Sequence, residues 1–236
     1  MAKKYLVTLM FMLVVAMPRA QEIQKLSADV TMQALSGYNY THGWYFGADI
    51  KGKMSIDNVD IALNMEALSK SVYTFGLSVA PSFKVCKNGY VFVDGTLHSR
   101  MYSKFKTYDF IYAGSLGYKM RHFLAQVGIY GRVIGNSSKE SHSTEGFLVE
   151  PFNLLYRLTV SIKGFDHPWD VYLTGSNFNE FEFERMAQPI FTLGGRWNFK
   201  ERWSAVAEGM LKPSGFFHQN VSFYEALLRI GINYKL

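Results

Sequence analysis

The chain has 236 residues, a formal net charge of +6, 16% aromatic residues and a single cysteine, Cys86. One cysteine excludes a disulfide framework and a metal site built from several cysteines. The mean hydropathy is close to zero, which argues against a protein built from membrane-spanning helices. The basic residues are spread along the chain rather than gathered into a patch, so the charge does not indicate nucleic-acid binding.

Residues 1–20 have the pattern of a cleaved secretory signal peptide. Lys3 and Lys4 form a basic start, residues 5–17 are mostly apolar, and Ala20 is a small residue before Gln21. The apolar run is roughly 13 residues, shorter than the ~20 that a spanning helix needs. Because no linker or change of composition follows, we expect residues 21–236 to be exported as one domain.

Apolar and polar residues then alternate along nearly the whole remaining sequence. A period of two is typical of a β-strand with two unlike faces. In the last tract, for example, Leu228, Ile230 and Ile232 share one face, and Arg229 and Asn233 share the other. About twelve such tracts follow one another, at residues 26–34, 44–51, 59–66, 73–79, 91–100, 109–119, 123–133, 152–163, 169–174, 188–199, 203–212 and 223–236.

A soluble sandwich also alternates, but three features favour a membrane barrel. Most tracts are long for a soluble sheet, where five or six residues are typical. Their apolar faces carry almost no charge, and aromatic residues such as Trp44, Trp197 and Trp203 gather at the tract ends, where the two membrane interfaces lie. In hydrocarbon, only a helix or a closed sheet satisfies every backbone hydrogen bond. The sequence therefore predicts an all-β fold, a single antiparallel transmembrane β-barrel of about twelve strands.

The connections between the tracts alternate in length, which indicates a topology. Short turns at one membrane face and longer loops at the other are typical of outer-membrane barrels. We therefore expect the N- and C-termini to be periplasmic. The short connections are residues 52–56, 84–89, 120–122, 164–168 and 200–202, and the expected outer connections include residues 36–43, 135–151, 175–187 and 213–222.

These features together resemble the Gram-negative outer-membrane β-barrel proteins. The resemblance covers almost all of the exported chain and depends on the signal peptide, the repeated alternation and the terminal tract Arg229-Ile230-Gly231-Ile232-Asn233-Tyr234-Lys235-Leu236. That tract is similar to the C-terminal signal by which such barrels are assembled. The resemblance implies location in the cell outer membrane, with the lipid bilayer as partner. It is to a broad class and assigns no functional residue.

The polar faces of the strands predict a charged lumen. Acids are enriched in the first six strands and bases in the last six. One hypothesis is a field across a narrow channel that orients small polar solutes. Another is a set of ion pairs that fill the lumen of a structural barrel, because buried charges need partners. The lumen-facing candidates are Asp29, Asp49, Asp60, Asp94, Asp109, Arg132, Arg157, Arg196 and Arg229.

We expect a passive small-solute channel or a structural barrel subunit. The alternatives are an accessory subunit of an outer-membrane assembly or transport complex, with protein partners there, and a membrane-embedded enzyme. No catalytic, cofactor or metal spacing is evident: among the histidines only His98 faces inward in mid-strand, and Ser99 points the other way. We therefore expect no enzyme and no cofactor. Residues 177–184 alternate phenylalanine with glutamate, which favours a hairpin beyond the membrane over a partner-docking strand.

Overall fold

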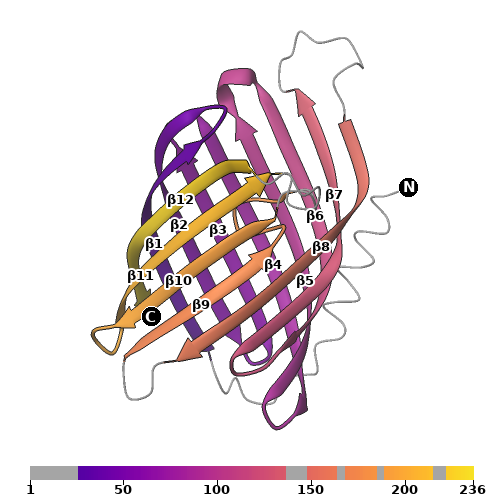
Figure 1. Cartoon of the computed structure of the whole chain (residues 1–236). Helices are drawn as coiled ribbons and strands as arrows, with labels where there is room; N and C mark the ends of the chain where they lie inside the picture. Colours follow the sequence, from indigo (N-terminus) through magenta and orange to yellow (C-terminus); the bar gives the residue numbers. More distant parts are fainter. Residues whose placement is uncertain (1–25, 137–147, 164–167, 185–188, 215–221) are drawn as a thin grey trace.

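The computed structural model describes residues 26–136, 148–163, 168–184, 189–214 and 222–236. It is a closed antiparallel barrel in which each strand pairs with its neighbours in sequence (Figure 1). The predicted all-β barrel of twelve strands is confirmed. The strands are β1 (Leu26–Asn39), β2 (Gly43–Ile56), β3 (Val59–Leu68), β4 (Val72–Cys86), β5 (Gly89–Tyr102), β6 (Thr107–Lys119), β7 (Phe123–Asn136), β8 (Leu148–Lys163), β9 (Trp169–Ser176), β10 (Ile190–Asn198), β11 (Trp203–Ser214) and β12 (Ser222–Lys235).

The last strand closes the barrel by pairing with the first. β12 runs antiparallel to β1, with Tyr234 opposite Val30 and Ile230 opposite Ala34. This pairing leaves no free sheet edge within the described strands. It also fixes which side chains meet at the seam, because a shift by one residue would exchange the lipid-facing and lumen-facing sets.

The outer surface of the barrel is apolar along the middle of the strands. Met32 on β1, Leu158 on β8 and Ile230 on β12 are each about half exposed, and they share the face that alternation predicts. Aromatic pairs lie near the strand ends: Trp203 and Tyr234 have ring centroids 4.7 Å apart. Such a surface is suited to a hydrocarbon layer bounded by aromatic girdles.

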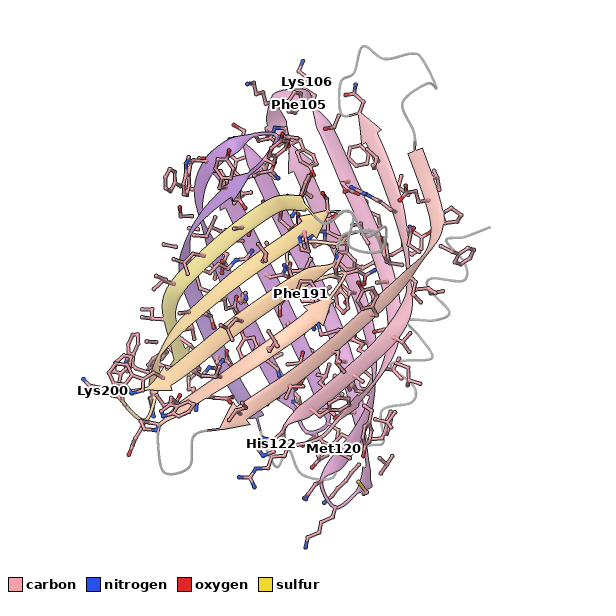
Figure 2. The ribbon with its side chains drawn as sticks, viewed as in Figure 1. Phe105, Lys106, Met120, His122, Phe191 and Lys200 are labelled. Atoms are coloured by element: carbon pink, nitrogen blue, oxygen red, sulfur yellow. The ribbon has the colours of Figure 1, made fainter. Side chains whose placement is uncertain are left out.

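The two ends of the barrel differ in the length of their connections. At one end of the barrel, here named the turn end, the strands are joined by residues 57–58, 87–88, 120–122, 164–168 and 199–202. At the opposite end, here named the loop end, the strands are joined by residues 40–42, 69–71, 103–106, 137–147, 177–189 and 215–221. Figure 2 shows Met120, His122 and Lys200 at the turn end, and Phe105 and Lys106 at the loop end.

The first strand, β1, begins at the turn end and the last strand, β12, finishes there, because Asp29 and Lys235 are paired at that end. The predicted signal peptide, residues 1–20, lies outside the described residues, as does most of the expected outer connection around residues 137–147. No helix in the described ranges is long and apolar enough to cross a membrane.

Candidate functional site: the lumen and its inserted loop

The connection between β9 and β10 folds into the barrel. Its residues Asn177–Glu184, here named the lumen loop, place Phe178, Phe181 and Phe183 in the interior, with exposures of 5%, 0% and 7%. The expected hairpin beyond the membrane is therefore wrong in direction. A hairpin does form: Phe178 and Phe183 are bridged, and the Asn179 amide donates to the Glu182 carbonyl at 2.7 Å.

The glutamates of the lumen loop are held by cations of the barrel wall. Glu182 accepts from Arg100 on β5 at 3.3 Å and from Lys212 on β11 at 2.7 Å. Lys212 also lies 2.7 Å from Glu184. Glu180 is 3.8 Å from Lys51 on β2. Because these cations come from strands spread around the barrel, the loop is fixed from several sides.

The phenylalanines of the lumen loop meet apolar and cationic groups of the wall. Phe178 and Phe183 pack in a cluster with Ile111, Tyr130 and Leu155. The guanidinium of Arg157 lies 4.1 Å from the centre of the Phe178 ring. Phe181 has no exposed surface and lies under two cations, with Arg229 4.9 Å and Lys51 5.2 Å from its ring centre. These are distances at which cation–π attraction operates.

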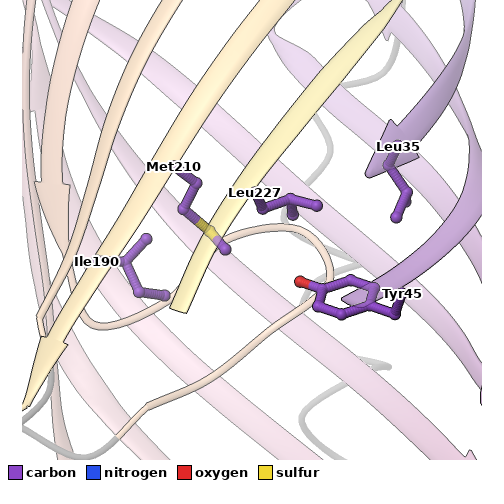
Figure 3. Close-up of a cluster of buried hydrophobic side chains, with 5 residues drawn as sticks. All are labelled: Leu35, Tyr45, Ile190, Met210 and Leu227. Carbon is purple, nitrogen blue, oxygen red and sulfur yellow. The ribbon is translucent and has the colours of Figure 1, made fainter. Parts of the chain in front are cut away.

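A second apolar cluster lies on the lumen side of the barrel wall, near the level of the lumen loop. Figure 3 shows its members on strands far apart in sequence: Leu35, Tyr45, Ile190, Met210 and Leu227. Leu227 interrupts the alternation of β12, where it shares a face with Glu225 and Arg229. The cluster gives the reason, since Leu227 is 6% exposed and packs inside the lumen. The side chains of the loop and of this cluster therefore narrow the lumen at the level of the loop.

Ion pairs also connect neighbouring or nearby strands of the wall on the lumen side. Arg229 lies 3.2 Å from Asp49 and 2.8 Å from Glu66, and all three side chains are nearly inaccessible. The Nε group of Arg132 donates to both oxygens of Asp109 at 2.9 Å.

A polar cavity remains between the lumen loop and the turn end, with a volume of about 390 Å³. Asn179 and Glu180 of the loop line it, together with wall residues such as Asn64, Ser78 and Tyr172. Of the nine candidate residues, the structure places Asp29, Asp60, Asp94, Arg157 and Arg196 on this cavity. The others, Asp49, Asp109, Arg132 and Arg229, form the ion pairs described above.

The most important residues that the sequence did not reveal as lumen residues are those of the loop itself. Glu180, Glu182 and Phe181 stand in an alternating run like that of the strands, but the run has no partner strand next to it in sequence. An alternating run without a neighbouring partner strand was the sequence signal that could have identified this loop. The direction of the loop depends on Lys51, Arg100 and Lys212, which are distant in the chain.

The groups with possible chemistry do not form a reactive constellation in the described part of the chain. His98 is buried against the Phe183 ring, with centroids 5.3 Å apart. Within the described ranges, no three histidine, cysteine or acidic residues are grouped so that they could hold a metal ion. Cys86 is exposed where β4 ends and lies 3.7 Å from the Tyr118 hydroxyl.

Solved structures of other proteins share the architecture of this chain. No protein-family model matches the chain, and no curated protein resembles it in sequence. Among solved structures, it is similar to KdgM porin in complex with disordered oligogalacturonate, with a TM-score of 0.55 and 7% identity over 87% of this chain and 98% of that one. It is also similar to NanC porin, with a TM-score of 0.53 and 12% identity over 87% of this chain and all of that one.

The fold is that of an outer-membrane β-barrel. The translocator domain of autotransporter NalP from Neisseria meningitidis is another similar structure, with a TM-score of 0.53 and 12% identity over 99% of this chain and 96% of that one. Porins and an autotransporter domain thus share this architecture, and identities this low concern the fold alone. The prediction of an outer-membrane type of barrel is confirmed at the level of the fold, and what the barrel does must be argued from its lumen.

Proposed function

We propose that this protein is a passive outer-membrane channel for small polar solutes, narrowed by the lumen loop. The observation that carries the proposal is the combination of a polar cavity of about 390 Å³ at the turn end with a loop held beside it by side-chain contacts. Side chains fill most barrels of about eight strands, and those of about sixteen enclose wide water channels. A twelve-stranded barrel with an inserted loop fits a narrow pore between these cases.

The orientation that suits this function places the turn end in the periplasm. The longer connections, which include residues 177–189 and 137–147, then join strands at the outer end of the barrel. The expected signal peptide would deliver the chain to the periplasm before assembly. In this orientation the lumen loop enters the barrel from outside, and the polar cavity lies on the periplasmic side of it.

The fold supports a channel in a general way, because KdgM and NanC are described as porins. The oligogalacturonate belongs to the KdgM structure. In this chain, acids and bases both line the cavity, which suits small polar solutes of either charge better than a polymer of one sign.

The second candidate is a structural barrel or an accessory subunit of an outer-membrane complex. A specific observation favours it: the lumen at the level of the loop holds two apolar clusters and several buried ion pairs. Such packing would stiffen a closed barrel without any transport. The two candidates differ in whether solutes pass.

Solute entry into vesicles separates the two candidates. Purified barrel is reconstituted into liposomes, and swelling is measured in isosmotic sugars of increasing size. A narrowed channel is expected to admit the smallest sugars and to exclude trisaccharides, because the lumen loop limits the opening. Swelling in no sugar, from vesicles that contain correctly folded barrel, would contradict the channel and favour the structural candidate.

A further inference from the structure

At the level of the lumen loop, carboxylates outnumber the cations that pair with them. Lys51 on β2 is shared by Glu180 of the loop, at 3.8 Å, and by Glu208 on β11, at 3.5 Å. The Tyr172 hydroxyl donates to Glu208 and helps to hold that carboxylate in place. Two carboxylates beside one ammonium group leave one negative charge in excess.

The same excess recurs in two further clusters around the lumen loop. Arg229 is shared by Asp49, at 3.2 Å, and by Glu66, at 2.8 Å. Lys212 and Arg100 together pair with three carboxylates, those of Glu182, Glu184 and Glu225. Within the described ranges, the carboxylates of the three clusters form no other ion pair. Each cluster therefore carries one negative charge more than its cations compensate.

The other charged groups that line the lumen here add no excess of cations. Lys53 pairs with Asp60 at 2.8 Å, and Arg132 pairs with Asp109. The remaining charged residues on the polar cavity are two arginines and two aspartates, namely Arg157, Arg196, Asp29 and Asp94. The lining of the cavity therefore does not cancel the negative charge of the three clusters.

Basic residues at the turn end stand apart from these clusters. Lys84, Lys200 and Lys235 are exposed there. Lys235 lies roughly 20 Å beyond Arg229 along β12, at the usual rise of a β-strand. In water of about 0.15 M ionic strength, charges are screened over about 8 Å. The bases of the turn end therefore act on ions that approach the barrel, whereas the clusters act on ions that pass the loop.

We propose that the lumen selects cations, both inorganic ions and small amines, over anions of the same size. A carboxylate without a full counter-charge is costly in a narrow lumen, and a mobile cation that passes the loop supplies the missing charge. Glu180 and Glu208 are the selecting residues that ions contact, because both line the cavity and the Glu180 side chain is 49% exposed. The inference rests on the proposed channel, since selection requires passage.

Reversal potentials of single channels in a gradient of potassium chloride measure this selectivity. The parent is expected to pass potassium at least about threefold more readily than chloride. The Glu180→Gln/Glu208→Gln variant leaves Lys51 without a carboxylate partner, so its ratio of potassium to chloride permeability should fall to about one or below. Lys51→Met changes the charge of the same cluster in the opposite direction, and its ratio should rise above the parental value.

Glu201→Gln provides the control, because it removes a glutamate charge from an exposed connection at the turn end. Its permeability ratio should equal that of the parent. A wider pore would move the ratios of both lumen variants toward one, so opposite shifts separate an effect of charge from an effect of width.

Two results would overturn the cation selectivity while the channel stands. One is a parental ratio near one in a conducting barrel, and the other is a pair of lumen variants whose ratios do not move in opposite directions. Heat-modifiable gel mobility shows that each protein tested is folded. Absence of current from every folded barrel would overturn the channel, and the selectivity with it.

Discussion

Replacing Ile230 with arginine is expected to prevent assembly of the barrel in the membrane. Ile230 lies near the middle of β12, is 57% exposed on the outer face and is flanked by Ala34 and Ala207. An arginine on the lipid face at the bilayer midplane costs about 2–4 kcal/mol. Because β12 also closes the barrel against β1, the effect falls on the closing step.

Ser78→Arg is the matched control for Ile230→Arg. Ser78 lines the polar cavity inside the lumen, so the same new side chain there meets water and carboxylates instead of lipid. The measurement is the fraction of membrane-inserted barrel that keeps its compact, heat-modifiable gel mobility. We expect that fraction to fall sharply for Ile230→Arg and to stay near the parental value for Ser78→Arg. Equal fractions would show that the assigned facing of β12 is wrong.

Replacing Lys212 with methionine is expected to release the lumen loop and to lower the stability of the barrel. The Lys212 side chain is 1% exposed and lies 2.7 Å from Glu182, 2.7 Å from Glu184 and 2.8 Å from Glu225. Breaking a buried ion pair by removal of one partner costs about 3–5 kcal/mol, because the other charges are left uncompensated. Glu182 keeps its ion pair with Arg100, but Glu184 and Glu225 lose the ion pair with Lys212.

Urea unfolding in lipid vesicles measures the effect of Lys212→Met. Lys104→Met is the control, since Lys104 is exposed in the short 3₁₀ turn between β5 and β6. Adding Glu184→Gln and Glu225→Gln to Lys212→Met should recover part of the lost stability, because neutral side chains need no cation. A Lys212→Met variant as stable as Lys104→Met would show that this cluster does not hold the loop.

The barrel itself follows from the sequence because membrane strands have a local signature. Residues such as Met32, Leu158 and Ile230 must face lipid, and their neighbours need not, so the period of two is visible in each strand separately. Closure could be predicted as well, since an unpaired edge cannot stay in hydrocarbon. Strand bounds were less certain, because several strands continue beyond the alternating tracts; β1 extends to Asn39, for example.

The lumen loop could not be predicted in the same way. Alternating phenylalanine and glutamate in residues 178–184 suits an exposed hairpin as well as an inserted one. The choice depends on cations of β2, β5 and β11 and on the apolar clusters of the wall, which come together only in the closed barrel. Likewise, the pairing of Arg229 with Asp49 and Glu66 depends on side-chain reach across the seam.

Single-channel conductance tests the central claim most directly, namely that the lumen loop narrows a conducting barrel. The parent is compared with a variant in which residues 178–184 are replaced by a short Gly-Ser linker that leaves β9 and β10 intact. Heat-modifiable mobility of both proteins controls for folding. We predict small current steps for the parent and severalfold larger steps for the variant. The reason is that the variant lacks the side chains of residues 178–184, which narrow the lumen. Equal conductance of the two folded barrels, or none in either, would contradict the claim.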